Sequence, residues 1–276
     1  MTTTQKIIKY LAMAFAVFLI FTIISSILGG IFGLSKVLGL KKNNTISKEL
    51  SNLEWNKDSE TIKNLDININ SSNLTIKLGE NFKIDTNNDN IKCNQKGETL
   101  KIEENNKWFF ENDSAELVIY IPRGIEIDET VINTGAGSVN IEELITEKLK
   151  LNLGAGETKI EKIVTNDAKI DTGAGKLKIA SGNINDLDLD LDIGIGETDI
   201  TARITGESKI DTGIGSVKLN LIGAKEDYKI NVSKGIGEVK IAGEKVADNE
   251  TVGNGENVIK LNGGIGEIKV EFELEK

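Results

Sequence analysis

The sequence predicts an all-β fold, a parallel β-solenoid with coils of about 20 residues, preceded by a single transmembrane α-helix. Three observations predict it. Short runs alternate apolar and polar residues, a Gly-Ala-Gly or Gly-Ile-Gly motif recurs through the second half, and a long run without charge stands near the amino terminus. Alternation with a period of two is typical of half-buried strands, and a repeat of this length is typical of stacked coils.

The amino-terminal segment is expected to anchor the chain in a membrane as a single-pass helix. Residues Tyr10–Ser35 carry no charge over 26 positions. As a helix they would extend about 39 Å, which exceeds a hydrocarbon core of about 30 Å. A cleaved signal peptide is the alternative, but its apolar region usually has about 7–15 residues, and no A-x-A site follows. Lysines flank the run almost equally, so charge leaves the membrane orientation open.

Small residues recur at every fourth position of this segment. Ser25, Gly29 and Gly33 would form a ridge on one side of the helix. Such a ridge lets two helices pack closely, so it indicates a homodimer through the anchor. Small residues without a role are the alternative interpretation, because matches to this pattern are frequent in membrane helices.

The chain divides by composition into four expected segments. These are an anchor over 1–40, a polar linker over 41–60, a β region capping the solenoid over 61–130, and the solenoid repeats over 131–276. In the capping region, runs such as "NLDININ", "TLKIEE" and "ELVIYIP" alternate as strands do. The stretch "QKGET" is expected to be a hairpin turn, and Pro122 is expected to end a strand because it has no backbone N–H.

The repeat is anchored on pairs of glycines that we expect to form structural turns. Seven motifs follow one another at steps of 19, 19, 21, 19, 22 and 29 residues. Their glycines are Gly135 and Gly137, Gly154 and Gly156, Gly173 and Gly175, Gly194 and Gly196, Gly213 and Gly215, Gly235 and Gly237, and Gly264 and Gly266. Glycine suits backbone angles that are closed to residues with a Cβ.

Two positions of the repeat are aliphatic in every copy. They lie three residues before and six residues after the first glycine, so both are predicted to face the core. The middle residue of the motif is alanine in the first three copies and isoleucine in the last four. This change predicts a coil that widens or packs more deeply toward its carboxyl end.

A Gly-x-Gly turn between strands also raises the question of a phosphate site, as in "KIDTGAGKLKI" (169–179). A dinucleotide fingerprint needs G-x-G-x-x-G opening a helix, and a P-loop needs G-x-x-x-x-G-K-[ST]. Here no third glycine follows at the required position, and strand-like residues come next. No nucleotide and no other cofactor is predicted.

Composition argues against enzymes and against nucleic-acid partners. The chain has no histidine and one cysteine, Cys93, which removes the common general base and any Cys-His pair. Its net charge is −10, and because the first 42 residues carry five lysines and no acid, the remainder has a net charge of −15. Such a surface repels the phosphate backbone.

One polar column raises the question of a metal site. Two residues before the first glycine stand Asp171, Asp192 and Asp211 in three successive repeats. Stacked coils would place these carboxylates about 4.8 Å apart, which Ca²⁺ could relieve. A structural ladder is the favoured interpretation, since lysines stand two residues before Asp171 and Asp211 and charge rows are usually solvated.

Aromatic residues are nearly absent from the repeats but cluster just before them. Trp108, Phe109 and Phe110 stand together in "NKWFFEND". They are expected to cap the open end of the core, because terminal units of solenoids need a cap. Contact with a partner protein is the alternative, since interfaces favour exposed aromatic side chains.

The stretch "ELVIYIPRGIEIDETVINTGAGSVNIEEL", with the later "GAGETKIEKI" and "GIGSVKLNLIGAKEDYKI" units, resembles the bacterial putative-adhesin family of β-strand-repeat proteins, a domain of unknown function. The resemblance covers about residues 60–270. It implies a β-solenoid on the cell envelope and supplies no catalytic residues.

We therefore expect a non-enzymatic, membrane-anchored β-solenoid outside the bacterial cell, working as an adhesin or surface scaffold. Its carboxyl-terminal solenoid is expected to be extracytoplasmic. The alternative is an envelope-stress or regulatory protein that binds a membrane partner through its anchor, its aromatic cluster or its solenoid face. An enzyme is the third hypothesis and finds no nucleophile–base pair or metal-ligand cluster in the sequence.

Overall fold

The computed structural model describes residues 50–54, 61–105, 115–184 and 189–274. These residues form an all-β structure, as predicted, and their sheet does not close into a barrel. Within these ranges there is no α-helix, and therefore none that could cross a membrane. The predicted anchor, with Ser25, Gly29 and Gly33, lies outside the described residues, as do Trp108, Phe109 and Phe110.

The strands vary in length because several of them continue around the turns of the coil. They are β1 (Ser51–Asn52), β2 (Asn64–Ile69), β3 (Asn73–Gly79), β4 (Lys83–Thr86), β5 (Ile91–Lys96), β6 (Thr99–Glu104), β7 (Glu116–Pro122), β8 (Ile127–Ile184), β9 (Leu189–Ile204), β10 (Glu207–Ile222), β11 (Tyr228–Ser233), β12 (Ile236–Ile241), β13 (Glu244–Lys245), β14 (Thr251–Val252), β15 (Asn257–Asn262) and β16 (Ile265–Glu273). One short 3₁₀ helix, η1, covers Lys225–Asp227.

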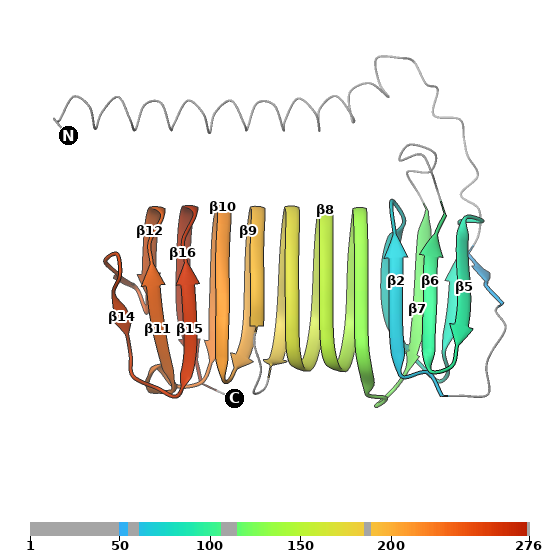
Figure 1. The fold of residues 1–276 in the computed structure, drawn as a ribbon, viewed down its shortest axis with the longest axis horizontal. Helices are drawn as coiled ribbons and strands as arrows, with labels where there is room; N and C mark the ends of the chain where they lie inside the picture. Colours follow the sequence, from blue (N-terminus) through green and yellow to red (C-terminus); the bar gives the residue numbers. More distant parts are fainter. Residues whose placement is uncertain (1–49, 55–60, 106–114, 185–188, 275–276) are drawn as a thin grey trace, which may run out of the picture. The chain divides into compact units, whose positions relative to one another are not determined.

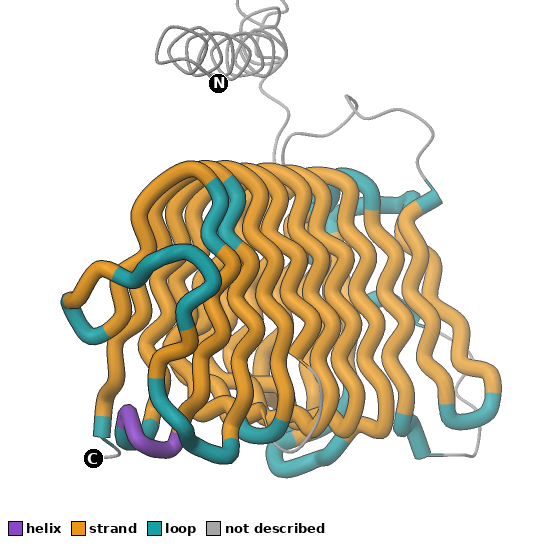
Figure 2. The backbone as a smooth tube through the Cα atoms, turned by 60° about the vertical axis from the view of Figure 1, so that its left-hand side comes forward, coloured by secondary structure: helices purple, strands orange, loops and turns teal. Residues whose placement is uncertain are grey.

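Successive coils lie side by side, and each pairs in parallel with its neighbour (Figures 1 and 2). In each coil one strand runs up the first layer, the chain turns at the Gly-x-Gly motif, and a second strand runs down the other layer. The register aligns the motifs, since Gly175 pairs with Gly196 and Gly196 pairs with Gly215. We call the row of stacked Gly-x-Gly motifs, together with the aligned Asn70–Ser72, the corner edge.

The core lies between the two layers and is formed by the two aliphatic columns. In the first column the described side chains are at most 3% exposed; they are Ile132, Leu151, Ile170, Ile210, Val232 and Leu261. In the second column all seven are at most 2% exposed; they are Ile141, Ile160, Ile179, Ile200, Leu219, Ile241 and Val270. The alternation of apolar and polar residues therefore correctly predicted which side chains face inward.

The last two repeats stack in an order that differs from the sequence. The coil of β15 and β16 pairs with β10 on one side and with β11 and β12 on the other. The coil of β11 and β12 is followed by β13 and β14, which pair with it antiparallel and cover its outer side. After β14 the chain returns as β15 and β16, which lie between β10 and the coil of β11 and β12. The repeat step of 29 residues contains β13 and β14, and the step of 22 residues contains η1.

The amino end of the stack is built in the same way. The coil of β2 and β3 pairs with β8, while the later coil of β6 and β7 lies outside it. The antiparallel strands β4 and β5 complete this end, and β1 pairs with β4. The expected hairpin joins β5 to β6, and β7 ends at Pro122, as predicted. Antiparallel outer strands block further parallel pairing at both ends.

The four corner isoleucines are not part of the core, so the prediction of deeper packing toward the carboxyl end is wrong. Ile236 is 45% exposed, and Ile195, Ile214 and Ile265 are partly exposed. The middle residue of each motif lies in the turn itself, between the strands of the two layers, and stays at least partly exposed. Alanine and isoleucine therefore alter the surface of the corner edge and leave the core unchanged.

Candidate functional site

Both glycines of each corner are required by close packing between coils, and the second is required also by its backbone angle. The second glycine of every motif has a positive φ, between 121° at Gly137 and 149° at Gly156 and Gly237, where an L side chain is strained. The first glycine is required by close packing between coils. A Cβ added at Gly173 would lie 2.3 Å from the carbonyl oxygen of Gly154 in the next coil. The corners therefore determine how closely coils approach.

The polar column just before the corners forms a ladder of side-chain hydrogen bonds at the amino end. The Asn133 side-chain amide donates to Asn68 Oδ1 at 2.7 Å, and the Asn152 amide donates to Asn133 Oδ1. Asn68 and Asn133 each donate one hydrogen bond and accept another, so these side chains link neighbouring coils directly.

The three aspartates of the metal hypothesis lie in register on adjacent coils. Asp171 pairs with Asp192, and Asp192 pairs with Asp211. The backbone therefore brings these positions together as the repeat predicts. The side chain of Asp192 lies outside the described residues. The side chains of the two outer members, Asp171 and Asp211, are described.

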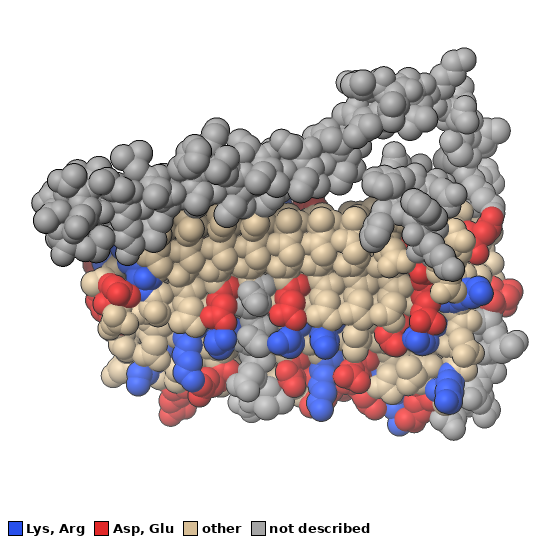
Figure 3. All heavy atoms as spheres, turned by 45° about the horizontal axis from the view of Figure 1, so that its top comes forward, with Lys and Arg blue, Asp and Glu red and all other residues tan. Residues whose placement is uncertain are grey.

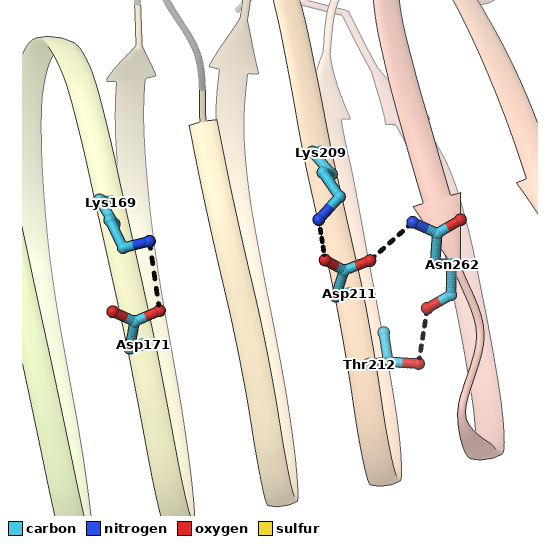
Figure 4. A network of polar contacts seen from close by, with 6 residues as sticks. All are labelled: Lys169, Asp171, Lys209, Asp211, Thr212 and Asn262. Atoms are coloured by element: carbon cyan, nitrogen blue, oxygen red, sulfur yellow. Dashed lines mark hydrogen bonds and ion pairs between the residues drawn. The ribbon is translucent and has the colours of Figure 1, made fainter.

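Both outer aspartates have cationic or amide partners (Figure 4). Lys169 Nζ lies 4.0 Å from Asp171 Oδ1, and Lys209 forms an ion pair with Asp211. The Asn262 amide also donates to Asp211 Oδ1 at 2.6 Å. Burial raises the pKa of Asp211, but the hydrogen bonds from Lys209 and Asn262 outweigh burial and hold it below its ordinary value. These partners supply the charge relief that a metal would otherwise provide.

Calcium is expected to leave the melting temperature unchanged. Within the described ranges, no group of three or more His, Cys, Asp or Glu side chains is placed to hold a metal ion. The lysines already compensate Asp171 and Asp211, and a hard cation needs six or more oxygen ligands. Thermal melts with millimolar Ca²⁺ and with a chelator test this. A rise in melting temperature that Asp211→Asn abolishes would establish the metal site instead.

The outer face of the second layer carries alternating charges that pair with one another. The outer face of the first layer has the same pattern in Figure 3, where red and blue side chains lie side by side below an uncharged strip along the corner edge. Lys240 lies 2.5 Å from Glu238 and 3.1 Å from Glu267. Hydrogen bonds from Lys240 and Lys245 lower the pKa of Glu238 to about 2. The outer face of the second layer is in contact with solvent, and its acidic and basic side chains form ion pairs with one another. A catalytic acid and base would instead lie in a cleft where both can reach a substrate.

A buried carboxylate at the amino end was missed by the sequence reasoning. Glu104 is 5% exposed, and its Oε2 accepts hydrogen bonds from the backbone N–H groups of Asn70, Ser71 and Ser72 at 2.7, 2.9 and 3.2 Å. Its Oε1 accepts from the Asn88 amide at 2.9 Å. Three successive N–H groups aimed at one oxygen form an anion-binding concavity. Glu104 therefore closes the corner edge at its amino end.

A signal for Glu104 was present in the sequence. In β6, Leu100, Ile102 and Glu104 occupy alternate positions, so the period of two places the carboxylate on the inward face. The segment Asn70–Ser72 aligns with the first Gly-x-Gly motif, since the Ala136 N–H donates to the Asn70 carbonyl at 2.7 Å. The inward position of Glu104 and the absence of glycine from the Asn70–Ser72 corner together indicate that Glu104 caps the backbone N–H groups of this corner.

Comparison with known proteins identifies the domain that these coils form. The family model described as Toastrack DUF4097 matches residues 62–271. The chain belongs to the Toastrack DUF4097 family. The match covers the described coils of β2 to β16 almost completely. It also agrees with the bacterial family that the sequence resembles.

Three solved structures are similar to this Toastrack chain. A putative cell adhesion protein from Clostridium sporogenes shares 17% identity, covering 82% of this chain and 98% of that chain, with a TM-score of 0.34. A putative adhesin from Bacteroides fragilis shares 15%, covering 81% and 98%, with a TM-score of 0.42. A putative adhesin from Parabacteroides distasonis shares 12%, covering 80% and 97%, with a TM-score of 0.28. No curated protein matches the chain.

The one cysteine of the Toastrack chain lacks the lowered thiol pKa of a catalytic nucleophile. Cys93 is partly buried, and burial raises the pKa of its thiol to about 12. The thiol therefore stays protonated at neutral pH, whereas a nucleophile needs the thiolate. One hollow in the surface is lined by corner residues such as Ile214, Ile236 and Ile265.

Proposed function

We propose that this Toastrack chain is a non-enzymatic, membrane-anchored protein of the bacterial cell envelope, whose solenoid works outside the cell as an adhesin or surface scaffold. The observation that supports it most is the stack itself, which presents two broad faces of short strands. Such faces suit contact with a large partner. In the described part of the chain, no three or more His, Cys, Asp or Glu side chains lie together where they could hold a metal ion.

The anchor in this proposal is the apolar run Tyr10–Ser35. The run has the length and composition of a spanning helix. The ridge of Ser25, Gly29 and Gly33 supplies a contact through which two anchors pair in the membrane. Adhesion gains from such pairing, because two linked solenoids bind a surface with higher avidity than one.

The full-length chain is expected to stay with the membrane pellet after extraction with alkaline carbonate, because a spanning helix is held by its apolar length. A variant that lacks residues 1–40 is expected to appear in the supernatant. Immunoblotting of both fractions measures this. Release of the full-length chain would contradict the anchor, and retention of the shortened chain would place the membrane contact elsewhere.

The adhesin role is tested by attachment of whole cells. Cells that display the full-length chain are expected to attach to host or bacterial surfaces more than cells in which the chain ends after residue 60. Both kinds of cell keep the anchor, so the comparison isolates the solenoid. Equal attachment across the surfaces tested would favour the regulatory alternative, in which the solenoid binds a membrane protein.

A further inference from the structure

We propose that the corner edge of the solenoid lies against the surface of the lipid bilayer, with its row of isoleucines at the level of the lipid headgroups. This placement rests on the proposed membrane anchor. It concerns one edge of the stack, and it leaves the two broad strand faces free for partners. Two independent features of the described chain lead to it.

The first feature is the composition of the corner edge. Register places Ile195 beside Ile214, Ile214 beside Ile265, and Ile265 beside Ile236. None of the four is buried, and Ile236 is 45% exposed. In the three preceding coils the same position is alanine. Glycine contributes no side chain between them, so the edge exposes a continuous apolar row.

Charged side chains begin only beside this row. The Gly-x-Gly positions themselves carry no charge, and the described edge visible in Figure 3 is an uncharged strip. Lys234 directly precedes Gly235, and the glutamates Glu197, Glu238 and Glu267 stand three residues after the first glycines of their motifs. An apolar row with a charged border is the pattern of a surface that dips into the headgroup region and stops there.

The second feature is the place where the described chain begins. Ser51 pairs with Thr86, and Thr86 pairs with Leu117 at the start of β7, directly after the corner. β1 runs away from the corner edge, so Leu50 lies on the side of that edge. Leu50 is 44% exposed. The chain that comes from the anchor therefore enters the solenoid at the corner edge.

The distance along the chain keeps this edge near the membrane. Fourteen residues separate Ser35 from Leu50, and fully extended they reach about 50 Å. The corner edge itself extends about 34 Å, since eight stacked corners are spaced by about 4.8 Å. A tether of this length holds the edge at a high effective concentration beside the bilayer. Weak partitioning of a few isoleucines is then sufficient to orient the solenoid.

The opposite edge of the stack provides a matched control. Leu274 is 76% exposed and directly follows β16, which runs from the corner edge across the whole layer. Nine residues of strand extend about 30 Å. Leu274 therefore lies at the edge of the stack opposite the corner edge, and it is more exposed than Ile236. The proposal expects Leu274 to stay in water.

The test uses the full-length chain reconstituted in phosphatidylcholine vesicles, with a single environment-sensitive fluorophore. Ile236→Cys and Leu274→Cys are labelled separately at neutral pH, where the protonated thiol of Cys93 reacts slowly. Labelled parent protein supplies the background. Ile214→Cys is a second probe of the corner edge in case Ile236→Cys does not fold. Lipids carrying a nitroxide on the upper acyl chain act as quenchers.

The probe at position 236 or 214 is expected to shift its emission to shorter wavelength and to be quenched several-fold more than the probe at position 274. Co-flotation with vesicles but equal quenching at both edges would overturn the placement while leaving the anchor intact. Failure to co-float would overturn the anchor and the placement together. Excimer emission between pyrene-labelled copies at position 236 in detergent would show that a second copy covers the edge, which also overturns the placement.

Discussion

Replacing Gly175 with alanine is expected to lower the free energy of unfolding by about 2–6 kcal/mol. Gly175 has a φ of +147°, which strains any residue with a Cβ. An added Cβ would also lie 1.8 Å from the carbonyl oxygen of Gly156 in the neighbouring coil. Backbone atoms on both sides cannot move apart without breaking the parallel ladder. Urea unfolding followed by circular dichroism measures the loss.

Gly124→Ala is the matched control for this change. Gly124 also has a positive φ, of +72°, but a Cβ there would meet no atom within 4 Å. Its cost is therefore that of the backbone conformation alone, about 1–2 kcal/mol. The difference between the two variants measures the contact between coils together with the greater backbone strain at Gly175, whose φ lies in a region that is essentially restricted to glycine. Equal losses would show that the corners are not packed as closely as the structure places them.

Replacing Glu104 with alanine is expected to cost about 3–5 kcal/mol of folding stability. The change leaves the N–H groups of Asn70, Ser71 and Ser72 without the acceptor that the buried Glu104 carboxylate provides. Glu103→Ala removes the neighbouring carboxylate, which is exposed and ion-paired with Lys101, and should cost about 0–1 kcal/mol. A similar loss in both variants would contradict a cap at Glu104.

Glu104 should also make stability depend on pH. Burial raises the pKa of Glu104, but hydrogen bonds from the Ser71, Asn70 and Ser72 amides outweigh burial and lower it below the ordinary value. A lowered folded-state pKa adds stability above the unfolded pKa of about 4.3, and the contribution is lost as the pH falls through the folded-state pKa. Glu104→Gln should therefore flatten the acid side of the melting-temperature profile.

Much of the fold was predictable because the repeat constrains each position in the same way. The two aliphatic columns and the hairpin before β6 follow from alternation and from turn residues, which are local properties. The order of the last two coils is not local. It depends on where β13 and β14 pair, and only the repeat step of 29 residues indicates an insertion there.

The candidate site shows the same division between local and long-range information. The row of Asp171, Asp192 and Asp211 follows from the repeat, but the pairing of Asp211 with Asn262 joins residues 51 positions apart. Glu104 and Asn70 are likewise 34 positions apart. The corner isoleucines were wrongly predicted to deepen the packing of the core. The repeat gives their position in the sequence, whereas the direction in which their side chains point depends on the backbone of the turn.

The side of the membrane on which the solenoid lies tests the proposed function most directly. Intact cells that express the full-length chain are treated with proteinase K, and antibodies against the solenoid follow its loss. Lysed cells and a cytoplasmic marker serve as controls. A surface adhesin or scaffold predicts that intact cells lose the solenoid while the marker survives. A solenoid that is degraded only after lysis would be cytoplasmic, and this result would contradict adhesion.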